Sequence, residues 1–209
     1  MTDPTPASDR PLHAVILCHP DPKSFNAAIA RRYCEAVQTL GHRVEVRDLY
    51  GSGFDPVLKG DERPDQNDYA LPEDIAREVD AISPADIIVL VYPIWFAMPP
   101  AMLIGYVDRV LGAGFSAEAL RRGENHSFLA GKRLLSFSTS GTSRQWLEEQ
   151  GAWLSLRNLF DDYIKRVFSL KSAEHIHFAP ITEGMKPRFA EEHLFEVEQT
   201  ARKMCSQFL

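Results

Sequence analysis

The stretch HAVILCHPDPKSFNAAIARR, residues 13–32, places a strand, a polar loop and the start of a helix directly after one another. Its first part, HAVILCH, is a continuous apolar run, which is typical of a parallel strand buried on both faces. From Ser24 onward the apolar residues follow a helical spacing, at Ile29, Tyr33, Val37 and Leu40. Gly41 then ends the helical pattern. This order of strand, loop and helix predicts an α/β fold.

The same alternation continues to the end of the chain. Further strands are predicted at 42–49, 85–93, 132–140 and 168–178. Further helices are predicted at 73–82, 98–112, about 144–167 with an interruption near Gly151, and 187–208. Five strands alternating with helices imply right-handed crossovers and a parallel sheet covered on both faces. The prediction is a flavodoxin-like three-layer sandwich with strand order 2-1-3-4-5 and a ligand edge after strands 1, 3 and 4.

Composition limits the function classes. The 209 residues are 44% hydrophobic and 25% charged, as in an ordinary globular domain, and residues 12–209 are predicted to form it after a flexible tail at 1–11. The net charge of −6 argues against a nucleic-acid partner. No apolar run approaches the length of a membrane span. The odd number of cysteines, without a CxxC pair, indicates a reducing compartment, and the predicted location is the cytoplasm.

The loop after the first strand has the residues of a phosphate site. Ser24 can cap the following helix, whose first N–H groups, at Phe25 and Asn26, would face an anion together with the positive end of the helix dipole. His19 and Lys23 could add donors. The alternative is a helix cap and a turn without a ligand. The glycines of a dinucleotide fingerprint or a P-loop are absent.

The loop after the third strand, YPIWFAMPP, carries aromatic residues where the strand ends. Pro93, Ile94, Trp95 and Phe96 could form a wall along a flat ring, with backbone groups bonded to its polar rim. The alternative is that Trp95 and Phe96 only cover the end of the sheet or a subunit contact.

The loop after the fourth strand, STSGTSRQW, is rich in small hydroxylated residues. Ser138, Thr139, Ser140 and Gly141 would let backbone approach a ligand closely, and Trp146 beyond them is a candidate substrate wall. The alternative is a capped turn. A serine-hydrolase elbow is rejected because it needs a glycine two residues before the serine. Together the three loops describe a flavin nucleotide site.

Four segments carry a family resemblance: CHPDPKSFNAAI, GHRVEVRDLYGSGFDPVL, ADIIVLVYPIWFAMPPAMLIGYVDRVLGAGF and GKRLLSFSTSG. By these the chain resembles the flavodoxin-like NAD(P)H:quinone oxidoreductases of the DT-diaphorase type and their bacterial relatives, over roughly residues 13–142. The resemblance implies a homodimer that binds FMN or FAD. It also implies ping-pong transfer of two electrons as hydride, from NAD(P)H through flavin N5 to a quinone-like acceptor. It places the residues of the first loop at the flavin phosphate and those of the other two loops along the ring.

The sequence also departs from the family. Ile104 stands where a lysine is usual, and Trp146 and Ala152 fall near the positions of a Tyr and a His that relay charge in the family. The C-terminal extension of the animal enzymes is missing, which favours FMN over FAD.

Two other functions stay open. One is a flavin-binding regulatory or interaction subunit, for example of a potassium efflux system. The other is a one-electron carrier, which the first loop argues against. No metal site is predicted, although His175 and His177 share one face of a strand. Arg109 is predicted to pair with an acidic neighbour on a solvated helix face.

Overall fold

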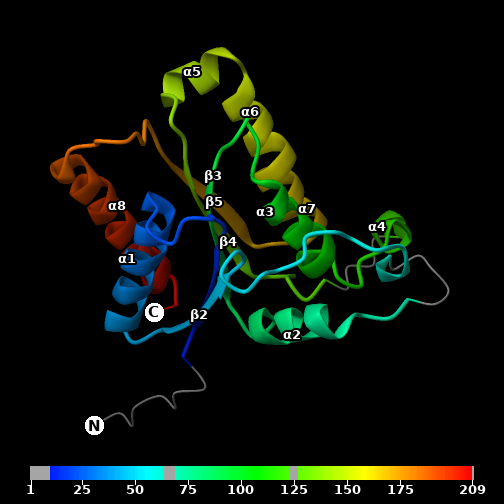
Figure 1. The fold of residues 1–209 in the computed structure, drawn as a ribbon. Helices are drawn as coiled ribbons and strands as arrows, with labels where there is room; N and C mark the ends of the chain where they lie inside the picture. The colour runs from blue at the N-terminus through cyan, green and yellow to red at the C-terminus, as the bar shows by residue number, and fades with distance from the viewer. Residues whose placement is uncertain (1–9, 64–68, 123–126, 209) are drawn as a thin grey trace, which may run out of the picture.

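The computed structural model describes residues 10–63, 69–122 and 127–208 and contains one five-stranded sheet (Figure 1). All strand pairs are parallel and the order is β2-β1-β3-β4-β5, so the predicted fold is confirmed. The strands are β1 Leu12–Leu17, β2 Arg43–Asp48, β3 Ile87–Pro93, β4 Arg133–Thr139 and β5 Ser172–Phe178. Most of the predicted tail at 1–11 lies outside the described residues.

Helices cover both faces of the sheet. On one face lie α1 Phe25–Thr39 and α8 Pro187–Ser206, which pack against each other (Figure 1). On the other lie α2 Glu73–Ile82, α3 Ala101–Tyr106, the π-helical turn η3 Val107–Leu111, α5 Arg144–Glu149, α6 Ala152–Leu156, the π-helical turn η4 Arg157–Asp162 and α7 Tyr163–Val167. The short helices η2 Gly60–Glu62 and α4 Ala117–Arg122 lie in the connections. No helix among the described residues is long and apolar enough to cross a membrane.

The predicted elements and the observed ones agree closely. The helical stretch expected at 144–167 is interrupted at Gly151, as predicted, where φ is +70°, and it continues through α6, η4 and α7. The predicted fifth strand begins at Ser172 and not at 168, because the backbone N–H groups of Phe168 and Leu170 still bond carbonyls of α7. The helix α4 was not predicted.

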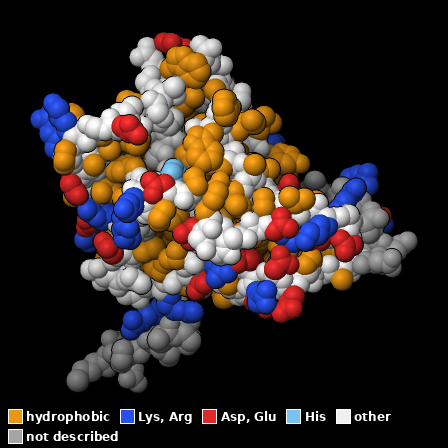
Figure 2. All heavy atoms as spheres, in the orientation of Figure 1, with side chains coloured by type: hydrophobic (Ala, Val, Ile, Leu, Met, Phe, Trp, Pro, Cys, Tyr) orange, Lys and Arg blue, Asp and Glu red, His pale blue; other side chains and the backbone are white. Residues whose placement is uncertain are grey.

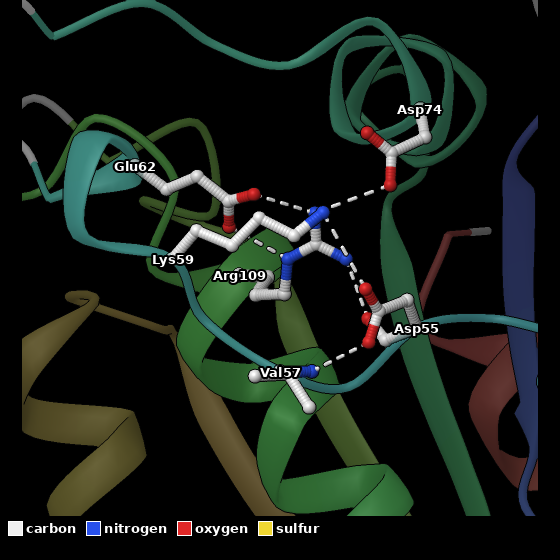
Figure 3. A network of polar contacts seen from close by, with 6 residues as sticks. All are labelled: Asp55, Val57, Lys59, Glu62, Asp74 and Arg109. Carbon is white, nitrogen blue, oxygen red and sulfur yellow. Dashed lines mark hydrogen bonds and ion pairs between the residues drawn. The ribbon is translucent and has the colours of Figure 1, made fainter.

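Arg109 is fully buried, so its predicted place on a solvated helix face is wrong. Its guanidinium donates two hydrogen bonds of 2.7 Å to the carboxylate of Glu62 and a third of 3.2 Å to Asp74 (Figure 3). It also donates to the backbone carbonyl of Asp55. A charge taken out of water is stable only with such partners. Arg109 therefore fastens the connection between β2 and α2 to η3.

The same connection lies directly against α3. A Cβ atom placed on Gly105 would approach the carbonyl oxygen of Pro56 to 2.2 Å, so only glycine permits this contact. The Pro56 segment, Gly105 and the Arg109 cluster together hold a long connection onto the helix that follows the aromatic loop after β3.

We expect Arg109→Ala to lower the free energy of unfolding by about 3–5 kcal/mol, because it leaves the buried Glu62 carboxylate without its partner. Urea unfolding followed by circular dichroism measures this. The matched control is Arg77→Ala, which removes an exposed pair with Glu73 and should cost less than about 1 kcal/mol. Equal losses in the two variants would contradict the assignment.

Candidate functional site

A small hollow lies at the carboxyl ends of β1, β3 and β4, where the strand order reverses. Its volume is about 180 Å³. It is lined by residues of all three predicted loops, and by one further residue: His19, Phe25, Asn26, Pro93, Ile94, Trp95, Thr139, Ser140, Gly141 and Ile181. Nine of the predicted site residues therefore meet in one place. Ile181 follows β5, and nothing in its sequence context marked it.

The first wall of this hollow is the N-terminus of α1. The Ser24 hydroxyl accepts the N–H of Ala27 at 3.2 Å and so caps the helix. The turn before it is rigid, because the N–H of Asp21 bonds Nδ1 of His19 and the Asp21 carboxylate accepts the N–H of Lys23. The first N–H groups of a helix have no partner within the helix, so this end can accept an anion.

The second wall is the aromatic loop after β3. The N–H of Ile94 bonds the carbonyl of Thr139 at 2.6 Å, which continues the sheet beyond both strands. Trp95 and Met98 exchange two backbone hydrogen bonds and form a tight turn. Phe96 and Ala97 at its tip have φ values of +50° and +63°. Such left-handed conformations are uncommon outside glycine and often occur at ligand sites.

The third wall is joined to the first by a buried side-chain bond. The amide of Asn26 donates to the Thr139 hydroxyl at 2.9 Å, and both residues are buried. This bond fixes the start of α1 against the end of β4. It therefore sets the distance between the N-terminus of α1 and the hydroxylated loop after β4.

The other predicted site residues are not among those that line the hollow. Lys23 and Trp146 are exposed, Phe96 is 97% exposed, and Ser24 faces its own helix. Ser138 is fully buried, with its hydroxyl directed away from the hollow and toward β5.

Ser138 belongs to a buried row of polar side chains that we call the β4–β5 chain. Its members are Asp161, His175, Ser138, His177 and Ser140. Asp161 bonds Nδ1 of His175 at 2.6 Å, and Nε2 of His175 bonds the Ser138 hydroxyl at 2.6 Å. Ser138 also bonds Nδ1 of His177 at 2.8 Å.

This row of hydrogen bonds ends at the hollow. Nε2 of His177 lies 3.0 Å from the Ser140 hydroxyl, which donates to the carbonyl of Thr142 at 2.7 Å. Ser140 is also one of the residues that line the hollow. A continuous row of hydrogen bonds therefore runs from Asp161 in η4 to the ligand edge.

Two helices shield the imidazoles from water. The Trp153 ring of α6 lies 4.9 Å from His175 and 5.1 Å from His177, between ring centres, and the guanidinium of Arg144 lies over the Trp153 ring at 4.8 Å. Burial, the neighbouring His175 and Arg144 lower the pKa of His177 to about 4. The shared face of the two histidines was visible in the sequence. Their partners were not, because these lie on other strands and helices.

The geometry defines a class of protein: an open parallel sheet with a hollow at its strand-order reversal, bounded by a helix N-terminus and an aromatic loop. The family model described as flavodoxin-like fold matches residues 13–204, so the chain belongs to that family.

The curated relatives carry related names. An uncharacterized NAD(P)H oxidoreductase of Haemophilus influenzae is 38% identical over 167 residues, which are 79% of this chain and 81% of the relative. The ribosyldihydronicotinamide dehydrogenase (quinone) of Mus musculus is 30% identical over 65% of this chain and 66% of its own length. The predicted resemblance to NAD(P)H:quinone oxidoreductases is confirmed, and so is the predicted enzyme class.

Solved structures agree on the fold. An NAD(P)H:quinone oxidoreductase from Methanothermobacter marburgensis has a TM-score of 0.77 at 23% identity and covers 93% of this chain and 96% of its own. An FMN-dependent NADH-azoreductase from Bacillus anthracis, solved with FMN, has a TM-score of 0.69 at 16% identity and covers 93% and 99%. At these identities the likeness concerns the fold alone.

Proposed function

We propose that this protein is an FMN-dependent NAD(P)H oxidoreductase that transfers two electrons to a quinone or similar acceptor. The observation that carries the proposal is the hollow at the strand-order reversal, which combines a helix N-terminus, an aromatic turn and a hydroxylated loop. The names of the curated relatives support the reaction class.

The residues present fit a flavin nucleotide. The capped start of α1, with His19 and Lys23 beside it, suits the phosphate group. The hollow of about 180 Å³ is smaller than the roughly 300–1,000 Å³ of a complete ligand pocket. It therefore suits one part of the nucleotide, with the ring along the turn of Trp95, whose side chain is 40% exposed.

Bound FMN would supply the hydride chemistry, accepting hydride at N5 from the nicotinamide and passing it on in a ping-pong cycle. The protein's contribution is position and environment. The Trp95 turn would hold one side of the ring, and the backbone N–H of Gly141 would stabilise negative charge at its polar edge. The Asn26 to Thr139 bond keeps these groups at a fixed separation.

The proposal has alternatives for the cofactor, the electron donor and the function. FAD is the alternative cofactor, and the electron donor is NADH or NADPH. A flavin-binding regulatory subunit is the alternative function.

For its location we propose the cytoplasm. The three cysteines Cys18, Cys34 and Cys205 are free, which fits a reducing compartment.

We expect the purified protein to show flavin absorption bands that bleach within the mixing time on anaerobic addition of NADPH or NADH and return on addition of a quinone. Bands that bleach only slowly would favour the regulatory subunit. A protein that takes up neither FMN nor FAD would contradict the proposal.

The phosphate position is tested by reversing the charge of Lys23. Lys23→Glu should weaken FMN binding about tenfold, which is about 1.4 kcal/mol, and should leave riboflavin binding unchanged because riboflavin has no phosphate. Fluorescence titration measures both affinities. The control is Lys171→Glu, an exposed charge reversal before β5 at the opposite edge of the sheet. Equal weakening of the two ligands would argue against a phosphate at α1.

We also propose that the protein is a homodimer. A second, more apolar hollow of about 520 Å³ lies between the connection around Leu58, the helix pair α3 and η3, and the pair η4 and α7. Apolar side chains gather over this side of the molecule (Figure 2). Leu159 and Tyr163 at its rim are 75% and 50% exposed. Exposed apolar patches of this kind mark protein interfaces.

Leu159→Glu should convert a dimer into a monomer, because it places a charge in the proposed apolar contact. Light scattering after size-exclusion chromatography measures the mass. Phe195→Glu is the control: Phe195 is 59% exposed on α8, across the sheet, and this variant should stay dimeric. A monomeric wild-type protein, or a dimer that survives Leu159→Glu, would contradict this interface.

A further inference from the structure

In the β4–β5 chain, the hydrogen-bonded contacts outnumber by one the protons that its hydroxyls and neutral imidazoles supply. Counting the contact from Ser140 to Thr142, five contacts link six groups. The groups at the two ends, an ionised Asp161 carboxylate and the Thr142 carbonyl, only accept. Between them, two hydroxyls and two neutral imidazoles bring four protons. A fifth proton therefore completes the chain.

Ser140 donates to Thr142, so it must accept from Nε2 of His177. Ser138 can donate to either imidazole, so every contact is filled with the extra proton on His175 or on His177. We place it on His175, because Nδ1 of His175 bonds the Asp161 carboxylate at 2.6 Å. Ser138 then donates to Nδ1 of His177 and accepts from Nε2 of His175. The stored proton lies in an ion pair with a buried carboxylate.

The groups around Asp161 and His175 are compatible with this position. Arg157 of η4 lies 3.3 Å from the same Asp161 oxygen and is partly exposed. The Ser136 hydroxyl donates to the other oxygen of Asp161 at 3.3 Å. The Tyr92 ring of β3 lies 6.1 Å from His175, and burial keeps the pKa of its phenol well above the ordinary value, so it stays neutral.

The other end of the chain disfavours the charge. His177 is shielded by Trp153, and the guanidinium of Arg144 approaches from α5. Burial, His175 and Arg144 hold the pKa of His177 to about 4, so a proton reaching it is passed on rather than kept.

We infer that the β4–β5 chain stores one proton and delivers it through Ser140 to the acceptor bound at the hollow. The inference deepens the proposed function and rests on it. Reduction of a quinone by NAD(P)H gives NAD(P)+ and a hydroquinone and consumes one proton besides the hydride. The chain ends at the place where that proton is needed.

The delivery step balances along the chain. The Ser140 hydroxyl turns from Thr142 and gives its proton to the acceptor, and the Nε2 proton of His177 replaces it. The proton of Ser138 moves to Nδ1 of His177, and the Nε2 proton of His175 moves to Ser138. The four protons that remain fill every contact except the one to Thr142. A proton from solvent refills the chain through Ser140.

The proton count can be measured without any cofactor. We expect nitrogen-15 spectra of the apo-protein at neutral pH to show His175 protonated on both ring nitrogens and His177 on Nε2 only. Asp161→Asn, whose amide can itself donate, should leave His175 neutral with its proton on Nε2. Finding His175 protonated on one ring nitrogen only would overturn this assignment, because the row would then hold four protons or carry its extra proton on His177.

The delivery is tested by separating the two half-reactions. In Ser140→Ala, reduction of the bound flavin by NADPH should keep its rate, since it needs no added proton. Reoxidation by quinone should slow at least about tenfold, and small buffer acids should restore it. Ser136→Ala is the matched control, because it contacts the same Asp161 from the same strand but lies outside the path.

The outcomes separate the two levels of the argument. A wild-type protein that binds no flavin fails the proposed function, while the nitrogen-15 spectra still decide the proton count. Equal slowing of both half-reactions in Ser140→Ala, or slowing that no buffer acid relieves, would overturn delivery through Ser140.

Discussion

The parallel pairing of β4 with β5 is the constraint on which the functional side of this protein depends. It sets Ser136 beside His175 and Ser138 beside His177 in the same register. Side chains that alternate along a strand return to the same face every second residue. The polar groups of both strands therefore stand on one face of a sheet that is covered on both sides, where water cannot satisfy them. They are stable because they bond one another, and the row they form can only run along the strands toward the carboxyl edge.

Two charge clusters are buried among the described residues, and their surroundings give them different tasks. Arg109 donates four hydrogen bonds, to Glu62, Asp74 and a backbone carbonyl. A guanidinium does not lose its proton in proteins, so this cluster can only fasten the loop that it joins. The Asp161 end of the β4–β5 chain consists instead of groups that exchange protons. The Arg109 cluster therefore fixes a loop in place, whereas the β4–β5 chain can conduct a proton.

The sequence allowed the fold to be predicted because the relevant signals are local. The spacing of apolar residues and the terminal punctuation gave α2 its observed bounds, Glu73–Ile82, and the start of α1 at Ser24. The three loops of the hollow could be predicted because parallel strands end at one edge. The burial of Arg109 could not, because its partners Asp74 and Glu62 lie 35 and 47 residues away, in α2 and in the connection before it. The β4–β5 chain depends on strand register and on a carboxylate in a π-helical turn, neither of which a single sequence displays.

This protein lacks a Tyr and a His at the positions where the quinone oxidoreductases that it resembles carry them. The proposed reaction nevertheless still consumes one proton. A side chain on a loop above the hollow could supply that proton, but Trp146 and Ala152 have no proton to give in that role. Supply of the proton along the β4–β5 chain needs a donor that lies at the hollow and a proton store that is shielded from water. Ser140 meets the first condition and the ion pair of Asp161 with His175 meets the second. The serines of β4, which looked from the sequence like small residues for close backbone approach, thereby gain a chemical reason for carrying hydroxyl groups.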